Sequence, residues 1–183
     1  MRSFWTGVLA GAALLIVLGA VALFTLPVGA DAGFLPLERT VAQFSLKRAI
    51  RSGAPASPFP FAPTDADLST GATLYVQNCA VCHGTPKRGE NAIARGQYVR
   101  PPYFPKRDVA DDPAGQTYWI IAHGARFTGM PAFGKLLSEK ELWDLAFFLK
   151  RQNDLPPAAK ALWEHPERVA APTPGPEPAD GPG

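Results

Sequence analysis

The sequence is short of the residues that bind metals. Its 183 residues include two cysteines, two methionines and three histidines. A structural zinc site needs four ligands, usually cysteine sulfur and histidine nitrogen; here one histidine directly follows a cysteine, and His165 lies near the C-terminus. The formal net charge is only +2, so no excess of positive charge indicates a nucleic-acid partner. A zinc domain and a nucleic-acid-binding domain are therefore both disfavoured.

Proline, by contrast, is abundant and is clustered at two places. Four of the ten residues at positions 54–63 are proline, as are six of the last 18 residues. Such segments bury too little apolar surface to offset the entropy of ordering them, so we expect a linker at 54–64 and a disordered tail at 155–183. The packed domain is then 65–154, which is small enough to need a covalent cross-link or a bound cofactor for stability.

An uncharged apolar run, Phe4 to Leu26, lies near the N-terminus. As a helix rising about 1.5 Å per residue, these 23 residues reach across the roughly 30 Å hydrocarbon core of a bilayer. We therefore expect residues 1–30 to be a retained transmembrane anchor. The alternative is a cleaved signal segment, whose apolar part usually has about 7–15 residues; the small residues Ala30 and Ala32 would suit a peptidase.

A short amphipathic helix is predicted at 31–53. Leu37, Val41 and Phe44 follow a helical spacing of four and then three. A basic cluster ends the segment: Lys47, Arg48 and Arg51. Three roles fit this pattern: a helix lying at the lipid head groups, a docking helix for a partner, or a helix resting on its own domain.

The stretch "NCAVCHG" contains both cysteines of the chain, Cys79 and Cys82, with His83 directly after them. A dithiol oxidoreductase places its CxxC motif in a βαβ context, but no alternating strand pattern precedes Cys79. Instead Leu68, Ala72 and Tyr75 recur at helical spacing before it. The motif therefore lies at the end of a helix, which disfavours dithiol chemistry.

The CxxCH pattern is the attachment motif of c-type haem. Two sulfurs about one turn apart reach the two vinyl groups of one porphyrin, and the adjacent imidazole of His83 reaches its iron. One motif predicts one covalently bound haem c, held by Cys79 and Cys82. Because this attachment takes place outside the cytoplasm, we expect a single-pass protein of the cytoplasmic membrane with its haem domain on the periplasmic side.

Met130 is the methionine available for the second axial position of the iron, since the other is Met1. Pro131 biases it toward an extended conformation, which suits a loop that crosses the porphyrin face. Histidine–methionine ligation raises the reduction potential and closes the iron to outside ligands. His123 is the rival ligand; otherwise we expect it to be partly exposed or to touch a haem propionate.

Three runs together resemble a class I c-type cytochrome in its membrane-anchored bacterial form: "DLSTGATLYVQNCAVCHG", "YWIIAHGARFTGMPAFG" and "LSEKELWDLAFFLKRQ". The resemblance implies an all-α fold with helices around one covalently bound haem, here with an N-terminal transmembrane helix. It also implies that the first domain helix crosses the last, with Gly71 close to an aromatic residue. The candidates for that residue are Phe148 and Trp143.

One local feature can be read without the resemblance, and another departs from the family pattern. Ser138 and Glu141 form a capping box at the start of the last helix. Class I cytochromes place a proline after CxxCH whose carbonyl orients the proximal imidazole; Pro86 is too close to the motif, so Pro101 or Pro102 is expected at the end of an enlarged loop.

Six basic residues occur between positions 87 and 107, and Glu90 alone opposes them: Lys87, Arg88, Arg95, Arg100, Lys106 and Arg107. They would form a solvated loop, or a collar that steers an acidic redox partner, or would contact haem propionates through Arg95 and Tyr98.

The sequence thus predicts a membrane-tethered monohaem carrier of single electrons between periplasmic or membrane redox proteins, without a small-molecule substrate and without enzymatic activity. One alternative is an accessory subunit of an oxidase or dehydrogenase complex, held by the Gly7 and Gly11 pair. Another is a haem sensor or peroxidase in which Met130 leaves the iron and His123 and Arg126 act at the opened site.

Overall fold

The computed structural model describes residues 2–55, 62–106 and 109–171, and within these ranges it contains helices and no strands. Residues 56–61 of the expected linker, Arg107 of the basic stretch and residues 172–183 of the expected tail lie outside the described residues. The chain divides into two compact units, residues 1–33 and residues 34–183. The all-α fold class is therefore confirmed for the described part of the chain.

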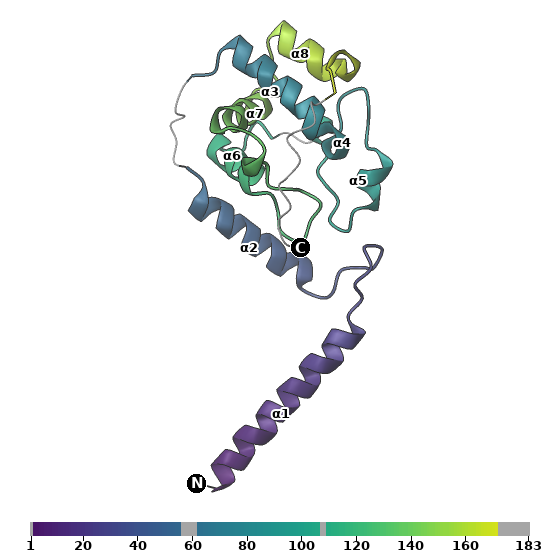
Figure 1. Cartoon of the computed structure of the whole chain (residues 1–183), viewed down its shortest axis with the longest axis vertical. Helices are drawn as coiled ribbons and strands as arrows, with labels where there is room; N and C mark the ends of the chain where they lie inside the picture. The colour runs from purple at the N-terminus through teal and green to yellow at the C-terminus, as the bar shows by residue number, and fades with distance from the viewer. Residues whose placement is uncertain (1, 56–61, 107–108, 172–183) are drawn as a thin grey trace. The chain divides into compact units, whose positions relative to one another are not determined.

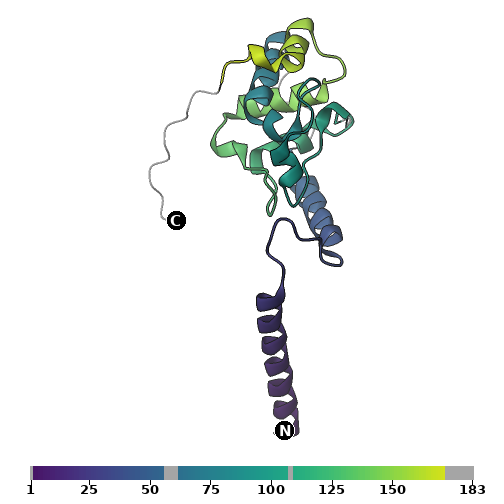
Figure 2. The ribbon, with the colours of Figure 1, turned by 90° about the vertical axis from the view of Figure 1, so that its right-hand side faces the viewer.

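The first unit is dominated by helix α1 (Arg2–Thr25), which Figure 2 shows as one unbroken helix. Its Ser3–Thr25 portion is long and apolar enough to cross a membrane. Large apolar side chains along it are exposed: Leu15 by 71% and Ile16 by 72%. In water such a surface would be costly, whereas a bilayer would cover it.

The second unit is built around the crossing of helices α3 (Asp65–Asn78) and α7 (Glu139–Lys150) (Figure 1). Side chains that face each other across it are almost fully buried, including Leu68 and Tyr75 of α3 and Leu145 and Phe148 of α7. The shorter elements complete the unit: α2 (Glu38–Gly53), α4 (Ala80–His83), α5 (Ala92–Gly96), η1 (Phe104–Lys106), α6 (Ala114–His123), η2 (Phe133–Lys135), α8 (Pro157–Glu164) and η3 (Pro166–Arg168).

Gly71 lets α3 and α7 approach closely. A Cβ atom at this position would overlap the carbonyl oxygen of Asp144 and lie 2.8 Å from the Cβ of Phe148. The predicted aromatic partner of Gly71 is therefore Phe148, while Trp143 packs against Tyr118 with ring centroids 4.4 Å apart.

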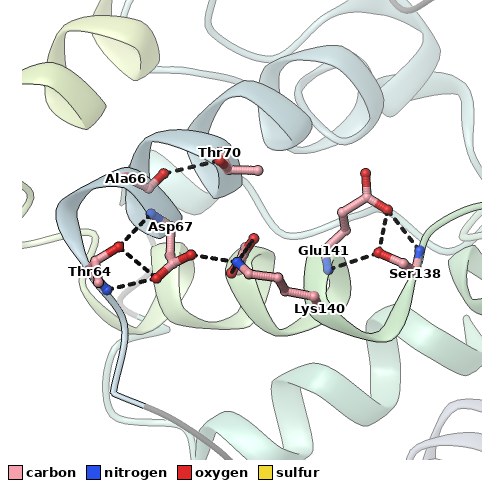
Figure 3. Close-up of polar contacts among 8 residues, drawn as sticks. Thr64, Ala66, Asp67, Thr70, Ser138, Lys140 and Glu141 are labelled. Atoms are coloured by element: carbon pink, nitrogen blue, oxygen red, sulfur yellow. Dashed lines mark hydrogen bonds and ion pairs between the residues drawn. The ribbon is translucent and has the colours of Figure 1, made fainter.

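Both crossing helices begin with a capping box (Figure 3). The predicted pair, Ser138 and Glu141, caps α7 reciprocally, and Thr64 and Asp67 do the same for α3. Each box satisfies backbone N–H groups that a helix start otherwise leaves without a partner. The sequence signal for the α7 cap is confirmed.

Lys140 joins the two helices at these starts. Its ammonium group contacts the carboxylate of Asp67 on α3 (Figure 3) and also that of Asp144 on α7. The Asp144 side chain is 1% exposed, and this burial raises the pKa of its carboxyl group. The Asp67 carboxylate accepts bonds from Lys140 and from the backbone and hydroxyl of Thr64, which lower its pKa to about 2.

The expectation of a disordered tail from residue 155 is wrong for the residues that form α8. This helix lies against α3, and its Ala159 is fully buried. The Trp163 ring meets Phe148 edge-on, with centroids 5.8 Å apart. Pro157 at the first turn explains the discrepancy, because proline is favoured at the first position of a helix, although it disrupts helix interiors.

Helix α2 belongs to the second unit and packs against α6. Of the three roles expected for 31–53, the structure thus shows contact with its own domain. A second contact joins α2 to the domain, because Tyr98 donates its hydroxyl to Glu38 at the start of α2.

Candidate functional site

Helix α3 delivers the CxxCH motif to the centre of the unit. Cys79 ends α3, and its carbonyl accepts the backbone N–H groups of Cys82 at 3.0 Å and His83 at 2.9 Å. These bonds wind the motif into the short helix α4 and bring both sulfurs within one turn. Gly84 then reverses the chain at φ +74°, where a Cβ atom would also overlap the ring of Tyr103.

The His83 imidazole is fixed on two sides. Its Nδ1 lies 2.9 Å from the carbonyl oxygen of Pro102, and the Phe104 ring stacks on it with centroids 4.3 Å apart and planes 6° from parallel. The predicted proline is therefore Pro102. Because a carbonyl only accepts, Nδ1 carries the hydrogen and the lone pair is on Nε2.

Burial keeps this imidazole neutral. The His83 residue is 9% exposed, and desolvation lowers its pKa, an effect that the bond to the Pro102 carbonyl partly offsets. A neutral imidazole with a defined tautomer is the form that binds a metal.

A cavity of about 330 Å³ opens beside the motif. The four residues singled out from the sequence all line it: Cys79, Cys82, His83 and Met130. Most of the remaining wall is apolar, with Leu46 of α2, Val99 and Ile121 among its members. The structure thus brings two thiols, a fixed imidazole and a thioether to one apolar cavity.

Met130 reaches this cavity from a loop outside any helix. The Thr128 hydroxyl accepts the Met130 N–H at 3.1 Å, and the Met130 carbonyl accepts the Ala125 N–H at 3.2 Å. Phe127, at the tip of this loop, has φ +62° and is 90% exposed. The backbone bonds therefore hold Met130 while the loop tip points into solvent.

The other two candidates from this region lie elsewhere. His123 is exposed at the end of α6 and packs its ring on Trp119, with centroids 4.6 Å apart. Arg126 is exposed as well. Neither lines the cavity, so the structure does not bring them to the motif.

The two residues expected to contact haem propionates, Arg95 and Tyr98, bond to other groups of the protein instead. Tyr98 donates to both oxygens of Glu38, at 2.8 and 2.7 Å, and the guanidinium of Arg95 donates to the carbonyl of Glu90. Of the basic stretch, Arg100 lines the cavity.

The Cys79 thiol does not have the electrostatics of a reactive dithiol site. Burial, and secondarily Cys82, raises the pKa of Cys79 to about 12, whereas reactive CxxC sites lower it. Within residues 2–55, 62–106 and 109–171, no three His, Cys, Asp or Glu side chains gather as a metal site. The cavity instead fits a flat apolar group that takes two sulfurs and an axial imidazole.

Three residues support the motif in ways that the sequence did not predict: Tyr75, Gln97 and Phe104. The Tyr75 hydroxyl donates to the Gly84 carbonyl at 2.7 Å, and burial raises its pKa. The Gln97 amide donates to the Cys82 sulfur at 3.2 Å. Phe104 stacks on His83, but its three-residue helix η1 has no periodic pattern that would reveal it.

The family model described as cytochrome C oxidase, cbb3-type, subunit III matches residues 66–149. These residues form a c-type cytochrome domain. The domain binds haem c covalently, and its size and single attachment motif are those of a one-haem domain. The matched residues run from α3 through almost all of α7, so the helix that contributes Leu46 to the cavity lies outside them.

Proposed function

We propose that this protein is a membrane-tethered monohaem c-type cytochrome that carries single electrons between redox proteins on the periplasmic side of the cytoplasmic membrane. The observation that supports this most is the convergence of Cys79, Cys82, His83 and Met130 on one apolar cavity. When bound, haem c supplies an iron that alternates between the ferrous and ferric states, and two protein axial ligands close it to outside molecules.

Each of the four residues has a distinct role in this proposal. Cys79 and Cys82 would hold the haem through thioether bonds. His83 would bind the iron through Nε2, because Nδ1 is committed to Pro102. Met130 would be the second protein ligand of the iron, since the bonds of its loop backbone keep it at the cavity.

Three exposed apolar residues form a surface where a partner would approach, which we term the rim patch: Val81, Ile93 and Phe127. Val81 precedes Cys82 directly, and Ile93 lies in α5, whose cap residue Gln97 bonds the Cys82 sulfur. A Cβ atom on Gly129, in the Phe127 loop, would lie 2.6 Å from the Gln97 side chain. All three segments therefore border the same edge of the cavity.

The membrane side of the proposal depends on α1. If α1 spans the membrane, covalent haem attachment outside the cytoplasm would put the N-terminus inside and the cytochrome domain in the periplasm. Tethering would raise the effective concentration of the domain near membrane-bound donors and acceptors.

A second candidate is an accessory subunit of an oxidase complex, which the description of the matching family model favours. Purification from mild detergent distinguishes the two. A free carrier migrates at the mass of the single chain, whereas a subunit elutes with larger proteins.

The optical spectrum of the ferric protein tests the axial ligands. We expect the weak far-red band of methionine-ligated haem, its loss in Met130→Leu and its retention in His123→Leu. Mass spectrometry of the peptide containing residues 79–83 should find the haem adduct. A ferric protein that lacks the band at neutral pH would refute Met130, and a peptide without adduct would refute the carrier.

A further inference from the structure

Helix α2 has two apolar faces, and only one of them packs against its own domain. On the inner face Leu46, Ala49 and Ile50 are partly buried, and Leu46 lines the haem cavity. At the end of α2, a Cβ atom on Gly53 would overlap the Trp119 ring of α6. This face fixes α2 to the cytochrome domain.

The outer face presents the stripe predicted from the sequence. Leu37 is 75% exposed, Val41 60% and Phe44 69%. At 3.6 residues per turn Val41 and Phe44 align on one side of the helix, opposite Leu46, and Leu37 is the residue just before the helix. Leu35 is also 39% exposed, whereas the Phe34 ring packs on Tyr98 with centroids 4.7 Å apart. Exposed apolar side chains gathered on one side of a helix mark an interaction site.

Basic residues continue along the same side of the helix beyond Phe44. Arg48 and Arg51 follow Phe44 at spacings of four and three, and Lys47 lies beside them, all exposed. The acidic residue of α2, Glu38, accepts the Tyr98 hydroxyl and the Leu35 N–H and so is turned away from the stripe. The outer face is thus apolar over its first half and basic over its second.

This composition matches an anionic lipid surface. Interfacial helices bury apolar side chains at the boundary of the acyl chains while lysine and arginine contact the head groups. The 12 residues from Leu26 to Leu37 separate α1 from α2, and that length of chain spans at most roughly 43 Å. A spanning α1 therefore keeps α2 within reach of the bilayer surface.

We propose that the outer face of α2 docks on the membrane surface, with Leu37, Val41 and Phe44 at the acyl-chain boundary and Arg48 and Arg51 on anionic head groups. The inference rests on the retained anchor of the proposed function. Because the inner face is fixed to α6 and contributes Leu46 to the cavity wall, docking presents the cytochrome domain to the bilayer in one orientation instead of letting it tumble on a tether.

Photocrosslinking of the full-length holoprotein tests this. The probe is p-benzoylphenylalanine, introduced as Phe44→p-benzoylphenylalanine, with Thr70→p-benzoylphenylalanine on the exposed side of α3 as matched control. In vesicles of phosphatidylethanolamine and phosphatidylglycerol, and in native membranes, we expect about tenfold more phospholipid adduct at 44 than at 70. Since each basic residue strengthens attraction to an anionic surface roughly fivefold, Arg48→Glu with Arg51→Glu should lower the adduct at 44 by about tenfold or more.

Equal phospholipid adducts at 44 and 70, or a protein adduct at 44 in native membranes, would overturn the docking. The haem-bearing peptide and the ferric spectrum, measured on the same samples, report on the proposed function separately. Flotation of the vesicles on a density gradient shows whether the protein associates with them. Association without lipid adduct at position 44 overturns only the docking. Absence of the protein from the floating vesicles overturns the retained anchor and the docking together.

Discussion

The Nδ1 atom of His83 lies 2.9 Å from the carbonyl oxygen of Pro102, across a loop of 18 residues that contains α5. The sequence departs from the family pattern at this point, and the enlarged loop nevertheless ends on a proline that performs the expected task. Such a bond fixes the tautomer of a metal-binding imidazole and increases its basicity.

Freeing the backbone at Pro102 should raise the reduction potential. In Pro102→Gly the carbonyl is held less firmly, so the imidazole becomes less basic and stabilises ferric iron less. We expect a rise on the order of 50 mV, equivalent to nearly a tenfold change for a one-electron couple. Pro101→Gly is the control, and redox titration of both proteins is the measurement. Equal shifts in the two variants would show that the bond has no specific effect.

Gly71→Ala should destabilise the domain by about 1–3 kcal/mol, because the added Cβ atom overlaps Asp144 and approaches Phe148. Helix propensity alone predicts the opposite sign, a gain of roughly 0.5–1 kcal/mol. Gly96→Ala in α5 is the control, since a Cβ atom there meets nothing within 4 Å. Urea unfolding followed by circular dichroism measures both, and an unchanged or higher midpoint for Gly71→Ala would contradict the close crossing.

Asp67 should contribute stability that acid removes. Its folded pKa of about 2 lies below the ordinary 3.8, so the ionised form favours folding above pH 3.8 and the contribution fades as the pH falls toward 2. Asp67→Asn should cost about 1 kcal/mol at pH 7, typical of a helix cap, and the cost should shrink as the pH falls through the folded pKa of about 2.

Asp154→Asn is the charge-matched control for that experiment. The Asp154 side chain is 87% exposed in its pair with Arg151, and exposed pairs contribute little. Unfolding free energies measured from pH 2 to pH 7 should therefore converge at low pH for Asp67→Asn and run parallel to wild type for Asp154→Asn. A pH-independent loss for Asp67→Asn would exclude the ion pair as its cause.

Phe127→Asn should slow electron transfer without unfolding the loop. Asparagine tolerates the positive φ of this position better than phenylalanine does. Folding is therefore preserved while the rim patch loses its aromatic ring. Aromatic residues at the centre of an interface commonly account for a fivefold or larger effect. We expect re-oxidation of the reduced protein by native membranes to slow by about that factor, with the ferric spectrum unchanged.

Leu136→Asn removes an apolar side chain that is 72% exposed and does not line the cavity. It should leave the re-oxidation rate unaltered. If both substitutions slow the reaction equally, the rim patch is not the contact surface.

Local patterns in the sequence predicted local features well. Spacing located the buried face of α3 at Leu68, Ala72 and Tyr75, and the Ser138 capping box located the start of α7. Both predictions succeed because helix periodicity and capping depend on residues three or four positions apart. The two candidate partners for Gly71, of which Phe148 is the one in contact, came instead from the resemblance to class I cytochromes.

Features that depend on distant residues were missed. Nothing local pairs Tyr98 with Glu38, 60 positions away, or places Leu46 in the cavity wall. The tail expected from residue 155 overlaps helix α8, where Pro157 lies at the start of the helix. The sequence signal for this helix is the helical spacing of Leu155, Ala159, Leu162 and Trp163 after that proline.

The contribution of Leu46 to the cavity bears on how the protein should be trimmed for study. A soluble fragment beginning at residue 65 retains every residue of the matched family region but loses Leu46 from the lining of the pocket. Water would gain access at that position, and haem potentials respond to solvent access. Electrochemistry on such a fragment would therefore describe an altered pocket, whereas a fragment that begins at α2 retains Leu46.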